Sequence, residues 1–342
     1  MAIPRMKVSK QPILWPRINC LTLALVAALA LTAFRPMPAS AAGMSPVTWE
    51  QLSPPTSPSA RADFAMSYDP VSQKVVLFGG YDATQDFNDT WTFDGTTWTL
   101  QNTPVAPSAR VGASMAFDQS IRKLVLFGGF NGSYLADTWI WDGATSTWTQ
   151  AQPTSSPGPL DGPMVFTDPL NGQASLFGGY DGTFYHAETW RFTGGTWQQL
   201  TPSISPTARA AAVLAFDPET RNAVLFGGVG DLNPYNTWTW DGTNWTEQSP
   251  ATQPPLLYYV ASAFDPALHA VIVFGGADGG TDEKQTWAWA GTSWRQLRPA
   301  KVPAARVFLG MAYDHATHQL LIFGGQINNV LRFFDDTWQL TQ

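Results

Sequence analysis

The chain has 342 residues, of which 44% are hydrophobic and only 13% are charged, with 16 Trp, 29 Gly and 27 Pro. This composition excludes an intrinsically disordered chain and a long-helix protein, because both are rich in charged residues and poor in aromatic ones. The net charge of −7 and the lack of a basic stripe argue against nucleic acid as a partner, since phosphate backbones bind clustered Lys and Arg.

Residues 1–41 have the pattern of an export signal. The segment contains cations and no acid, an apolar run over residues 21–34, and the small residues Ala39-Ser40-Ala41 that suit a signal peptidase. The apolar run is too short to span a bilayer comfortably, although an uncut membrane anchor is the alternative. We therefore expect a cleaved signal peptide at 1–41 and a secreted or periplasmic protein with no integral membrane segment after cleavage. Cleavage removes Cys20, the one cysteine of the chain.

Six copies of one repeat follow this segment. Phe-Gly-Gly occurs at near-equal steps, beginning at Phe78, Phe127, Phe177, Phe226, Phe274 and Phe323. An Asp stands nine residues before each copy, at Asp69, Asp118, Asp168, Asp217, Asp265 and Asp314. A Thr-Trp pair follows each copy, with its Trp at Trp91, Trp139, Trp190, Trp238, Trp287 and Trp338. Such a fixed period indicates an architecture of stacked repeats.

Each copy predicts four short strands. The first is apolar and rich in small residues, as at 111–117 and 210–216, and the second is an apolar run that ends at Phe-Gly-Gly. The third and fourth carry Trp residues and are joined by tight-turn pairs such as Asp94-Gly95. Six antiparallel sheets of this kind hide both faces only by stacking around an axis. The pattern therefore predicts an all-β, six-bladed propeller over residues 42–342.

The last copy lacks a fourth strand, because the chain ends soon after Trp338. The segment 47–52 matches a fourth strand, and its Trp49 stands 20 residues before Asp69, as a second Trp does before the next Asp in every other copy. We therefore expect the N-terminal strand to complete the last blade and close the ring.

The repeats resemble kelch repeats of the bacterial, galactose-oxidase-like variety, in which Gly-Gly ends the second strand and a Trp follows some 12 to 15 residues later. The resemblance covers residues 47–342 and implies a six-bladed kelch β-propeller with the first strand of each blade innermost. It implies no particular activity, since propellers serve enzymes and binding scaffolds alike.

Two enzymes of this kind give different expectations. Galactose oxidase is a copper enzyme with a Cys-Tyr crosslink, which a mature chain without Cys20 cannot form. We therefore expect no cofactor and no metal site, and the sequence shows no catalytic motif. The periplasmic sialic acid epimerase is also a secreted six-bladed kelch propeller, so a sugar-modifying enzyme is the alternative function.

The predicted topology gives the propeller two different faces. One, which we name the loop face, carries the Pro-rich links between blades and the loops after each Phe-Gly-Gly; the other, the turn face, carries only short turns. The loops differ between copies, which is typical of a recognition surface. Candidate ligand-binding residues in these loops are Asp86, Tyr134, Tyr185, His186 and Tyr235.

The position eight residues before each turn Asp gives further candidates, because four of its six members are arginine: Arg61, Arg110, Leu160, Arg209, Leu257 and Arg306. Guanidinium groups at the channel mouth would hold a carboxylate or similar anion. In the other interpretation they pair with backbone carbonyls or acids and fix the links. The residues before each Thr-Trp do not follow the arginine pattern, which makes an obligate Arg-acid pair in each blade doubtful. They are Asp89, Asp137, Glu188, Asn236, Gln285 and Asp336.

The function predicted from the sequence is therefore a secreted module that binds a protein, a carbohydrate or an organic anion through its loop face. In the enzyme alternative, the arginines grip the carboxylate of an acidic sugar while an acid or His186 moves a proton. A partner scaffold is the third class, and it predicts an exposed apolar patch near Phe333 and Phe334.

Overall fold

The computed structural model describes residues 47–230, 235–328 and 330–342. The expected signal peptide at 1–41 and the loop residues 231–234 lie outside this range. All regular structure within the range is β-strand, and none of it is a helix that could cross a bilayer.

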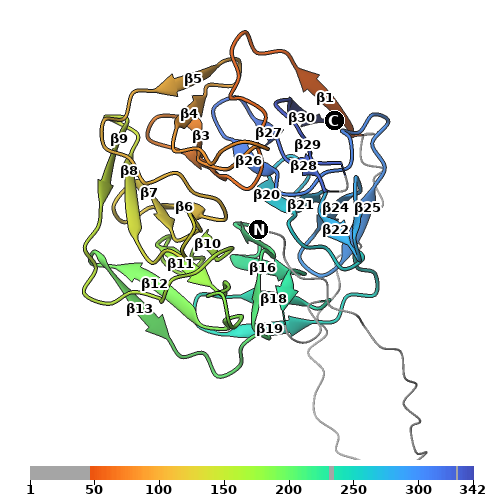
Figure 1. Ribbon diagram of the computed structural model, residues 1–342. Coiled ribbons are helices and arrows are strands. Elements are labelled where there is room, and N and C mark those ends of the chain that lie inside the picture. The colour runs from red at the N-terminus through yellow and green to blue at the C-terminus, as the bar shows by residue number, and fades with distance from the viewer. Residues whose placement is uncertain (1–46, 231–234, 329) are drawn as a thin grey trace, which may run out of the picture. The chain divides into compact units, whose positions relative to one another are not determined.

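Six four-stranded antiparallel sheets are arranged around an axis, as the sequence pattern predicts (Figure 1). We number the blades along the chain. Blade 1 contains β2 (Ala65–Asp69), β3 (Lys74–Phe78), β4 (Thr90–Phe93) and β5 (Trp98–Gln101). Blade 2 contains β6 (Ser114–Asp118), β7 (Lys123–Phe127), β8 (Thr138–Asp142) and β9 (Thr147–Gln150). Blade 3 contains β10 (Met164–Thr167), β11 (Ala174–Phe177), β12 (Thr189–Thr193) and β13 (Thr196–Leu200).

The second half of the ring repeats this arrangement. Blade 4 contains β15 (Val213–Asp217), β16 (Asn222–Phe226), β18 (Thr237–Trp240) and β19 (Trp245–Gln248). Blade 5 contains β20 (Ala261–Asp265), β21 (Ala270–Phe274), β24 (Thr286–Trp289) and β25 (Trp294–Leu297). Blade 6 contains β26 (Gly310–Asp314), β27 (Gln319–Phe323), β30 (Thr337–Thr341) and β1 (Thr48–Leu52).

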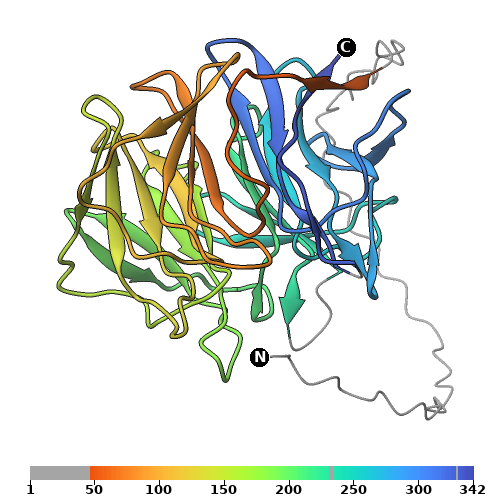
Figure 2. The ribbon, with the colours of Figure 1, turned by 45° about the horizontal axis from the view of Figure 1, so that its top comes forward.

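The N-terminal strand closes the ring as predicted. Strand β1 pairs antiparallel with β30, in a register that runs from Thr48 opposite Thr341 to Leu52 opposite Thr337. The two strands lie side by side at the outer edge of blade 6 (Figure 2). Blade 6 is therefore built from both ends of the propeller.

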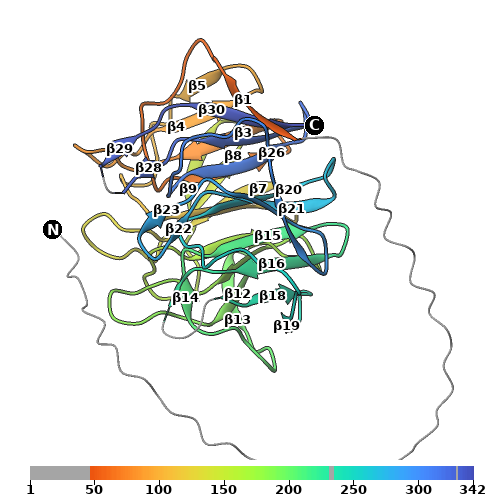
Figure 3. The same ribbon diagram turned by 90° about the vertical axis from the view of Figure 1, so that its right-hand side faces the viewer.

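The loop face carries additional short strands that the sequence pattern did not predict. Each pair contains a two-residue strand that follows the Phe-Gly-Gly motif of blade 4, 5 or 6, and the pairs lie on the same face of the propeller (Figure 3). They are β14 (Arg209–Ala210) with β17 (Val229–Gly230), β22 (Ala277–Asp278) with β23 (Thr281–Asp282), and β28 (Gln326–Ile327) with β29 (Arg332–Phe333).

The innermost strands begin about three residues later than the sequence predicts. The strand expected from residue 111 begins at Ser114, and the strand expected from residue 210 begins at Val213. The cause is a residue in the left-handed region before each strand, with φ of 62° at Gly112 and 52° at Ala211. A left-handed residue ends the extended conformation, so the strand starts after it.

One hydrogen bond, repeated six times, joins neighbouring blades. The indole Nε1 of each fourth-strand Trp donates to the Oγ1 of the Thr that begins the third strand of the adjacent blade. The pairs are Trp98–Thr337, Trp148–Thr90, Trp197–Thr138, Trp245–Thr189, Trp294–Thr237 and Trp49–Thr286, at 2.8–3.1 Å. Both partners are buried in every pair. This explains why the repeat needs Thr before its first Trp.

The Phe-Gly-Gly motif is explained by a close approach between blades. A Cβ on the first glycine would crowd the backbone of the next blade, as at Gly275, where it would lie 2.6 Å from the carbonyl oxygen of Arg306. The N–H of the second glycine, Gly276, donates to that same carbonyl at 2.9 Å. Both glycines also have positive φ, which other residues adopt at a cost.

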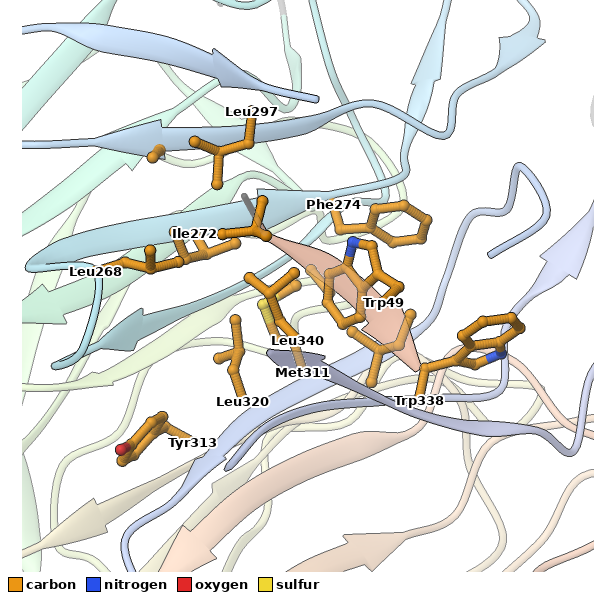
Figure 4. Packing of buried hydrophobic residues seen from close by; sticks show 14 of the residues in the cluster. Trp49, Leu268, Ile272, Phe274, Leu297, Met311, Tyr313, Leu320, Trp338 and Leu340 are labelled. Carbon is orange, nitrogen blue, oxygen red and sulfur yellow. The ribbon is translucent and has the colours of Figure 1, made fainter. Parts of the chain in front are cut away.

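The core consists of apolar clusters between adjacent blades. In the cluster between blades 5 and 6, Trp49 packs its ring 5.2 Å from that of Phe274, with Ile272, Met311 and Leu340 around them (Figure 4). A Trp that buries ~200 Å² contributes about 5 kcal/mol before entropy costs. The Trp residues of the repeat are thus accounted for by packing.

Candidate functional site

A ring of backbone hydrogen bonds surrounds the axis at the loop face. One residue of each blade, two after the Arg or Leu position, donates its N–H to the carbonyl of its counterpart in the neighbouring blade, at 2.9–3.1 Å. Six such bonds form a closed cycle through Asp63, Gly112, Gly162, Ala211, Tyr259 and Phe308. All six residues have φ between 52° and 62°. The ring fixes the residues that surround the loop-face end of the channel.

Four of these ring residues are not glycine. A left-handed conformation costs a side-chain-bearing residue about 1–2 kcal/mol, so it persists only where the surrounding structure enforces it. At Tyr259 and Phe308 it places two aromatic side chains side by side, with ring centroids 4.0 Å apart. The strained backbone therefore presents side chains at the centre of the loop face.

The four arginines do not line this centre. Their exposed fractions are 0–1%, so each guanidinium is enclosed within its own blade. Arg61 is representative, because its Nη1 and Nη2 hold the two carboxylate oxygens of Asp89 at 2.5 and 2.9 Å. Nη1 also donates to the carbonyl of Gly79, and Nε donates to that of Ser59. We name this set of acceptors the arginine socket.

The same socket holds Arg110 on Asp137 and Arg306 on Asp336, with Nη1–Oδ1 distances of 2.6 Å in both. Burial alone would raise the pKa of Asp137 and of Asp336, but the hydrogen bonds and charges of their arginines outweigh it and hold both values below the ordinary range. In blade 4, Arg209 meets the amide oxygen of Asn236 at 3.1 Å, and desolvation lowers its pKa to about 10.

These contacts bear on two expectations from the sequence. An obligate Arg-acid pair in every blade, which the sequence made doubtful, is not found: the pair forms in blades 1, 2 and 6, the three that contain both residues. For Arg61, Arg110, Arg209 and Arg306 the contacts agree with the other interpretation, in which the arginines fix the links, because their hydrogen bonds are engaged and their side chains are buried. The sugar-modifying alternative loses the observation on which it rested.

The centre of the loop face carries carboxyl groups instead. Asp63 belongs to the backbone ring and Asp161 precedes ring residue Gly162. Burial and the neighbouring Asp161 raise the pKa of Asp63 well above its usual value, and burial raises the pKa of Asp161 to about 6. Among the described residues, no donor satisfies the buried Oδ1 of Asp161. Ring residue Gly112 makes room for this oxygen, since a Cβ there would collide with it.

Tyrosines surround these carboxyl groups. Ring contacts run from Phe130 to Tyr134, Tyr180 and Tyr185, with successive centroids 5.1, 5.8 and 4.8 Å apart. Burial raises the pKa of Tyr259, and the negative charges of Asp63 and Asp161 raise it further. The centre is thus an acidic, tyrosine-lined surface.

The structure brings some of the predicted loop residues together. Tyr134 and Tyr185 both contact Tyr180, so they belong to one aromatic group. His186 hydrogen-bonds Asp181 through Nε2 at 3.0 Å and Glu188 through Nδ1 at 3.1 Å. The N–H of Phe184, followed by the hydrogen bond from His186, lowers the pKa of Asp181 to about 2.

The other two predicted residues lie at the edge of this site. Asp86 is exposed and pairs through its backbone with Tyr81. Desolvation, with smaller effects of Asp63 and Asp86, raises the pKa of Tyr81 to about 12, so Asp86 is close to the centre. Tyr235 is 46% exposed and follows the segment 231–234.

Sequence reasoning missed Asp63, Asp161, Tyr180 and Tyr259. Asp63 and Tyr259 stand six residues before their turn Asp, and Asp161 stands seven before. Their offset within the repeat is therefore as fixed as that of the arginines. A comparison of the six copies at these two offsets would have found these three residues, because the other copies have small or apolar residues there, apart from Tyr258.

Exposed apolar side chains mark the tips of the loops. Phe184, Tyr235, Val330 and Leu331 are 46–67% exposed, and all lie in loops that follow a Phe-Gly-Gly motif. The apolar patch expected near Phe333 and Phe334 is absent at Phe334, which is 7% exposed and lies 3.9 Å over the guanidinium of Arg306. The exposed apolar residues of the loop face are therefore at these loop tips and in the links, at Val105 and Ile204.

The axial channel contains a cavity of about 530 Å³, lined by the innermost strands. Its walls combine apolar side chains with polar groups and extend to His315 at the turn face, where the imidazole packs against Tyr68 and Tyr313 with centroids 5.2 and 4.8 Å away. Burial lowers the pKa of His315. Within the described part of the chain, no cluster of three or more His, Cys, Asp or Glu is arranged to hold a metal ion.

Comparisons with known proteins agree with this architecture. The family model of the KLHDC2/KLHL20/DRC7 Kelch-repeats domain matches residues 44–228, more than half of the chain. No curated protein matches the sequence. The six-bladed arrangement and the repeated Gly-Gly and Trp positions are those that the kelch resemblance implied. The chain therefore belongs to the Kelch-repeat family and is a six-bladed kelch β-propeller.

Proposed function

We propose that this propeller is a protein-binding module that engages its partner through the centre of the loop face. Kelch propellers generally bind proteins. The observation that carries the proposal is the placement of Asp63 and Asp161 beside the strained backbone ring, with tyrosines around them. Such strain is maintained where side chains must be held for recognition.

The charge of this centre indicates the chemistry of the partner. Two carboxyl groups with raised pKa values are short of compensating positive charge, so a cation that approaches them is favoured. The surrounding tyrosines add hydrogen bonds and cation-π contacts. We therefore propose that the partner presents a basic segment, in place of the organic anion expected from the sequence.

The exposed loop tips supply the apolar part of the interface. Phe184 and Leu331 are 66% and 63% exposed, on loops of blades 3 and 6. Protein interfaces combine buried aromatic anchors with polar groups that set specificity. This combination supports a protein partner over a small molecule.

We also propose that binding takes place outside the cytoplasm, because residues 1–41 have the sequence of an export signal. N-terminal sequencing of the chain recovered from the periplasm or the medium tests this point. A new N-terminus close to residue 42 supports it, and an uncut chain retained in the cytoplasm contradicts it.

Selection of peptides from a displayed random library on the immobilised protein tests the binding site. We expect the selected peptides to be rich in Lys, Arg and aromatic residues. We expect them to lose at least tenfold in affinity for the double variant Asp63→Asn, Asp161→Asn, since charged hydrogen bonds are worth ~1.5–3 kcal/mol each.

The turn face provides the matched control. His315→Gln changes a group at the opposite end of the channel and is expected to leave peptide affinity unchanged. Acidic peptides, or affinity that falls with His315→Gln and not with the double Asp variant, would contradict the proposal.

A further inference from the structure

Blade 3 differs from the other blades at the arginine socket. In blades 1, 2 and 6, the guanidinium is held by a carboxylate, by the carbonyl of the first glycine of Phe-Gly-Gly, and by the carbonyl two residues before the arginine. In blade 3 the arginine is replaced by Leu160, whose side chain belongs to the apolar cluster between blades 2 and 3. The space that an arginine would fill is therefore available.

The acceptors of the socket are all still present in blade 3. Their counterparts are Glu188, the carbonyl of Gly178 and the carbonyl of Gly158, at the same or nearly the same offsets in the repeat. These three residues line a cavity of about 150 Å³, together with Pro157, Leu160, His186, Trp190 and Gln199. Gly178 thus lacks the arginine donor that its counterparts Gly79, Gly128, Gly227 and Gly324 have.

Blade 5 shows that the loss of the arginine does not by itself leave such a site. There Leu257 accompanies Gln285, a neutral residue whose amide is engaged by Glu283 and Trp287. The arginine and the acid that pairs with it in other blades have both been replaced, and the carboxylate of Glu283 is engaged by the amide of Gln285. Blade 3 is the one blade of the six that retains the acid without the arginine.

The socket of blade 3 also retains an aromatic cover. In blade 1 the ring of Phe87 lies 4.0 Å from the guanidinium carbon of Arg61, and in blade 6 Phe334 lies 3.9 Å from that of Arg306. Both stand two residues before the acid. His186 occupies this position in blade 3, and an imidazole can stack on a guanidinium in the same way.

His186 occupies only part of the socket. Both hydrogen bonds that the carboxylate of Glu188 accepts from described residues, from His186 Nδ1 and the N–H of Ala187, end on Oε2. An arginine in the other blades engages both carboxylate oxygens and the glycine carbonyl. Oε1 and the Gly178 carbonyl are thus the acceptors that a second donor can reach.

We propose that this cavity binds a guanidinium group supplied from outside, with the arginine side chain of the partner as its source. Glu188 pairs with the guanidinium, the carbonyls of Gly178 and Gly158 accept its remaining N–H groups, and His186 covers it. The inference deepens the proposed function, because it names one residue type of the partner and its place at blade 3, beside the loop face.

Titration with N-acetyl-arginine methylamide, followed through the imidazole resonances of His186, tests the proposal on the full chain. The citrulline analogue has the same shape without the charge, and methylguanidinium carries the head group alone. We expect saturable binding of the arginine amide and at least tenfold weaker binding of the citrulline amide. Tighter binding of the arginine amide than of methylguanidinium identifies a peptide-borne arginine as the source, and equal affinity identifies the head group of a free guanidine compound.

Variants of the socket separate it from other acidic surfaces. Glu188→Gln is expected to weaken binding of the arginine amide at least tenfold, and Leu160→Arg is expected to abolish it by filling the cavity. Leu160→Met keeps an apolar side chain of similar volume and is expected to leave binding unchanged, so it controls for altered packing. The binding data of a variant are interpreted only when its thermal unfolding remains cooperative, which shows that it is folded.

Equal affinities for the arginine and citrulline amides, or unchanged affinity in both Glu188→Gln and Leu160→Arg, would overturn the inference. The proposed function is tested independently by the Asp63→Asn, Asp161→Asn variant. One outcome is that peptides lose affinity for the Asp63→Asn, Asp161→Asn variant and keep it for Leu160→Arg. That result would retain the loop face as the binding surface and would exclude the blade 3 socket from it.

Discussion

The indole Nε1 of Trp49 donates a hydrogen bond of 3.1 Å to Oγ1 of Thr286, a residue 237 positions farther along the chain. It is the same bond that joins every other pair of adjacent blades, and it attaches the N-terminal strand of blade 6 to blade 5. We expect Thr286→Val to destabilise the propeller by about 1–3 kcal/mol, because it leaves a buried indole N–H without an acceptor. Urea denaturation of the variant measures this loss.

Trp49→Ala tests the closure of the ring more severely. The side chain is fully buried against blade 5, and large-to-small changes of a buried Trp cost about 3–5 kcal/mol. We expect the Tm to fall by roughly 10 °C. Removal of the chain through Leu52 should lower it further, and an unchanged melting curve for that truncation would contradict the closure of blade 6 by β1.

Arg61→Leu tests whether the arginines are structural. The change leaves Asp89 partly buried without its cation, and loss of one partner of such a pair costs about 3–5 kcal/mol. The double variant Arg61→Leu, Asp89→Gln reproduces the combination that blade 5 has naturally at Leu257 and Gln285. We expect it to recover at least ~1 kcal/mol of the loss in urea denaturation. If the loss of unfolding free energy in the double variant equals the sum of the losses in the two single variants, the result argues against the pairing.

Asp161→Asn tests the electrostatics of the loop-face centre. The folded-state pKa of Asp161 is about 6, above the unfolded value near 3.9. The folded protein therefore binds the proton more tightly, and Asp161 costs no stability below about pH 4 but destabilises the fold increasingly as the pH rises to 6. We expect the stability of the variant relative to the wild type to rise across this window and to level off above it. A difference that does not change with pH would show that the carboxyl is not perturbed.

Gly275→Ala tests the close approach between blades. The added Cβ would lie 2.6 Å from the carbonyl oxygen of Arg306 in a residue with φ of 77°. Gly194 has φ of 60° and open space around it, so Gly194→Ala measures the cost of the conformation alone, about 1 kcal/mol. We expect Gly275→Ala to lower stability clearly more than Gly194→Ala in thermal unfolding. Equal losses would mean that the backbone at Arg306 can move to accommodate the added Cβ at little cost.

Much of the fold could be predicted from the sequence because the repeat offsets are nearly constant. Phe-Gly-Gly, the turn Asp and the Thr-Trp pair each mark a fixed point of the blade, and Trp49 repeats the same spacing at the N-terminus. The starts of the innermost strands could not be predicted, because Asp63, Tyr259 and Phe308 adopt a left-handed conformation that their residue types rarely have. The ring of hydrogen bonds that enforces it joins residues about 50 positions apart, and its closing bond joins Asp63 to Phe308 at the other end of the propeller chain.

The site was harder to predict than the fold. Tyr134 and Tyr185 were found because they stand in variable loops, whereas Asp161 lies in a link that the repeat appeared to explain. The arginine-acid pairs were hidden by two exceptions, Leu160 with Glu188 and Arg209 with Asn236. Because of these two exceptions, arginine and acid do not occur together in every repeat of the sequence. The arginine-acid pairs of the other blades form all the same.

Four blades hold a buried arginine at their loop-face end, whereas blade 3 keeps the acceptors of the arginine socket without the arginine. A double-mutant cycle of Leu160→Arg and Glu188→Gln in urea denaturation tests this central claim most directly, because the packing lost at Leu160 cancels in the cycle. We predict that the introduced arginine is more stabilising with Glu188 than with Gln by at least ~1 kcal/mol. Effects that add to within ~0.3 kcal/mol would show that the two side chains do not meet and would contradict the account.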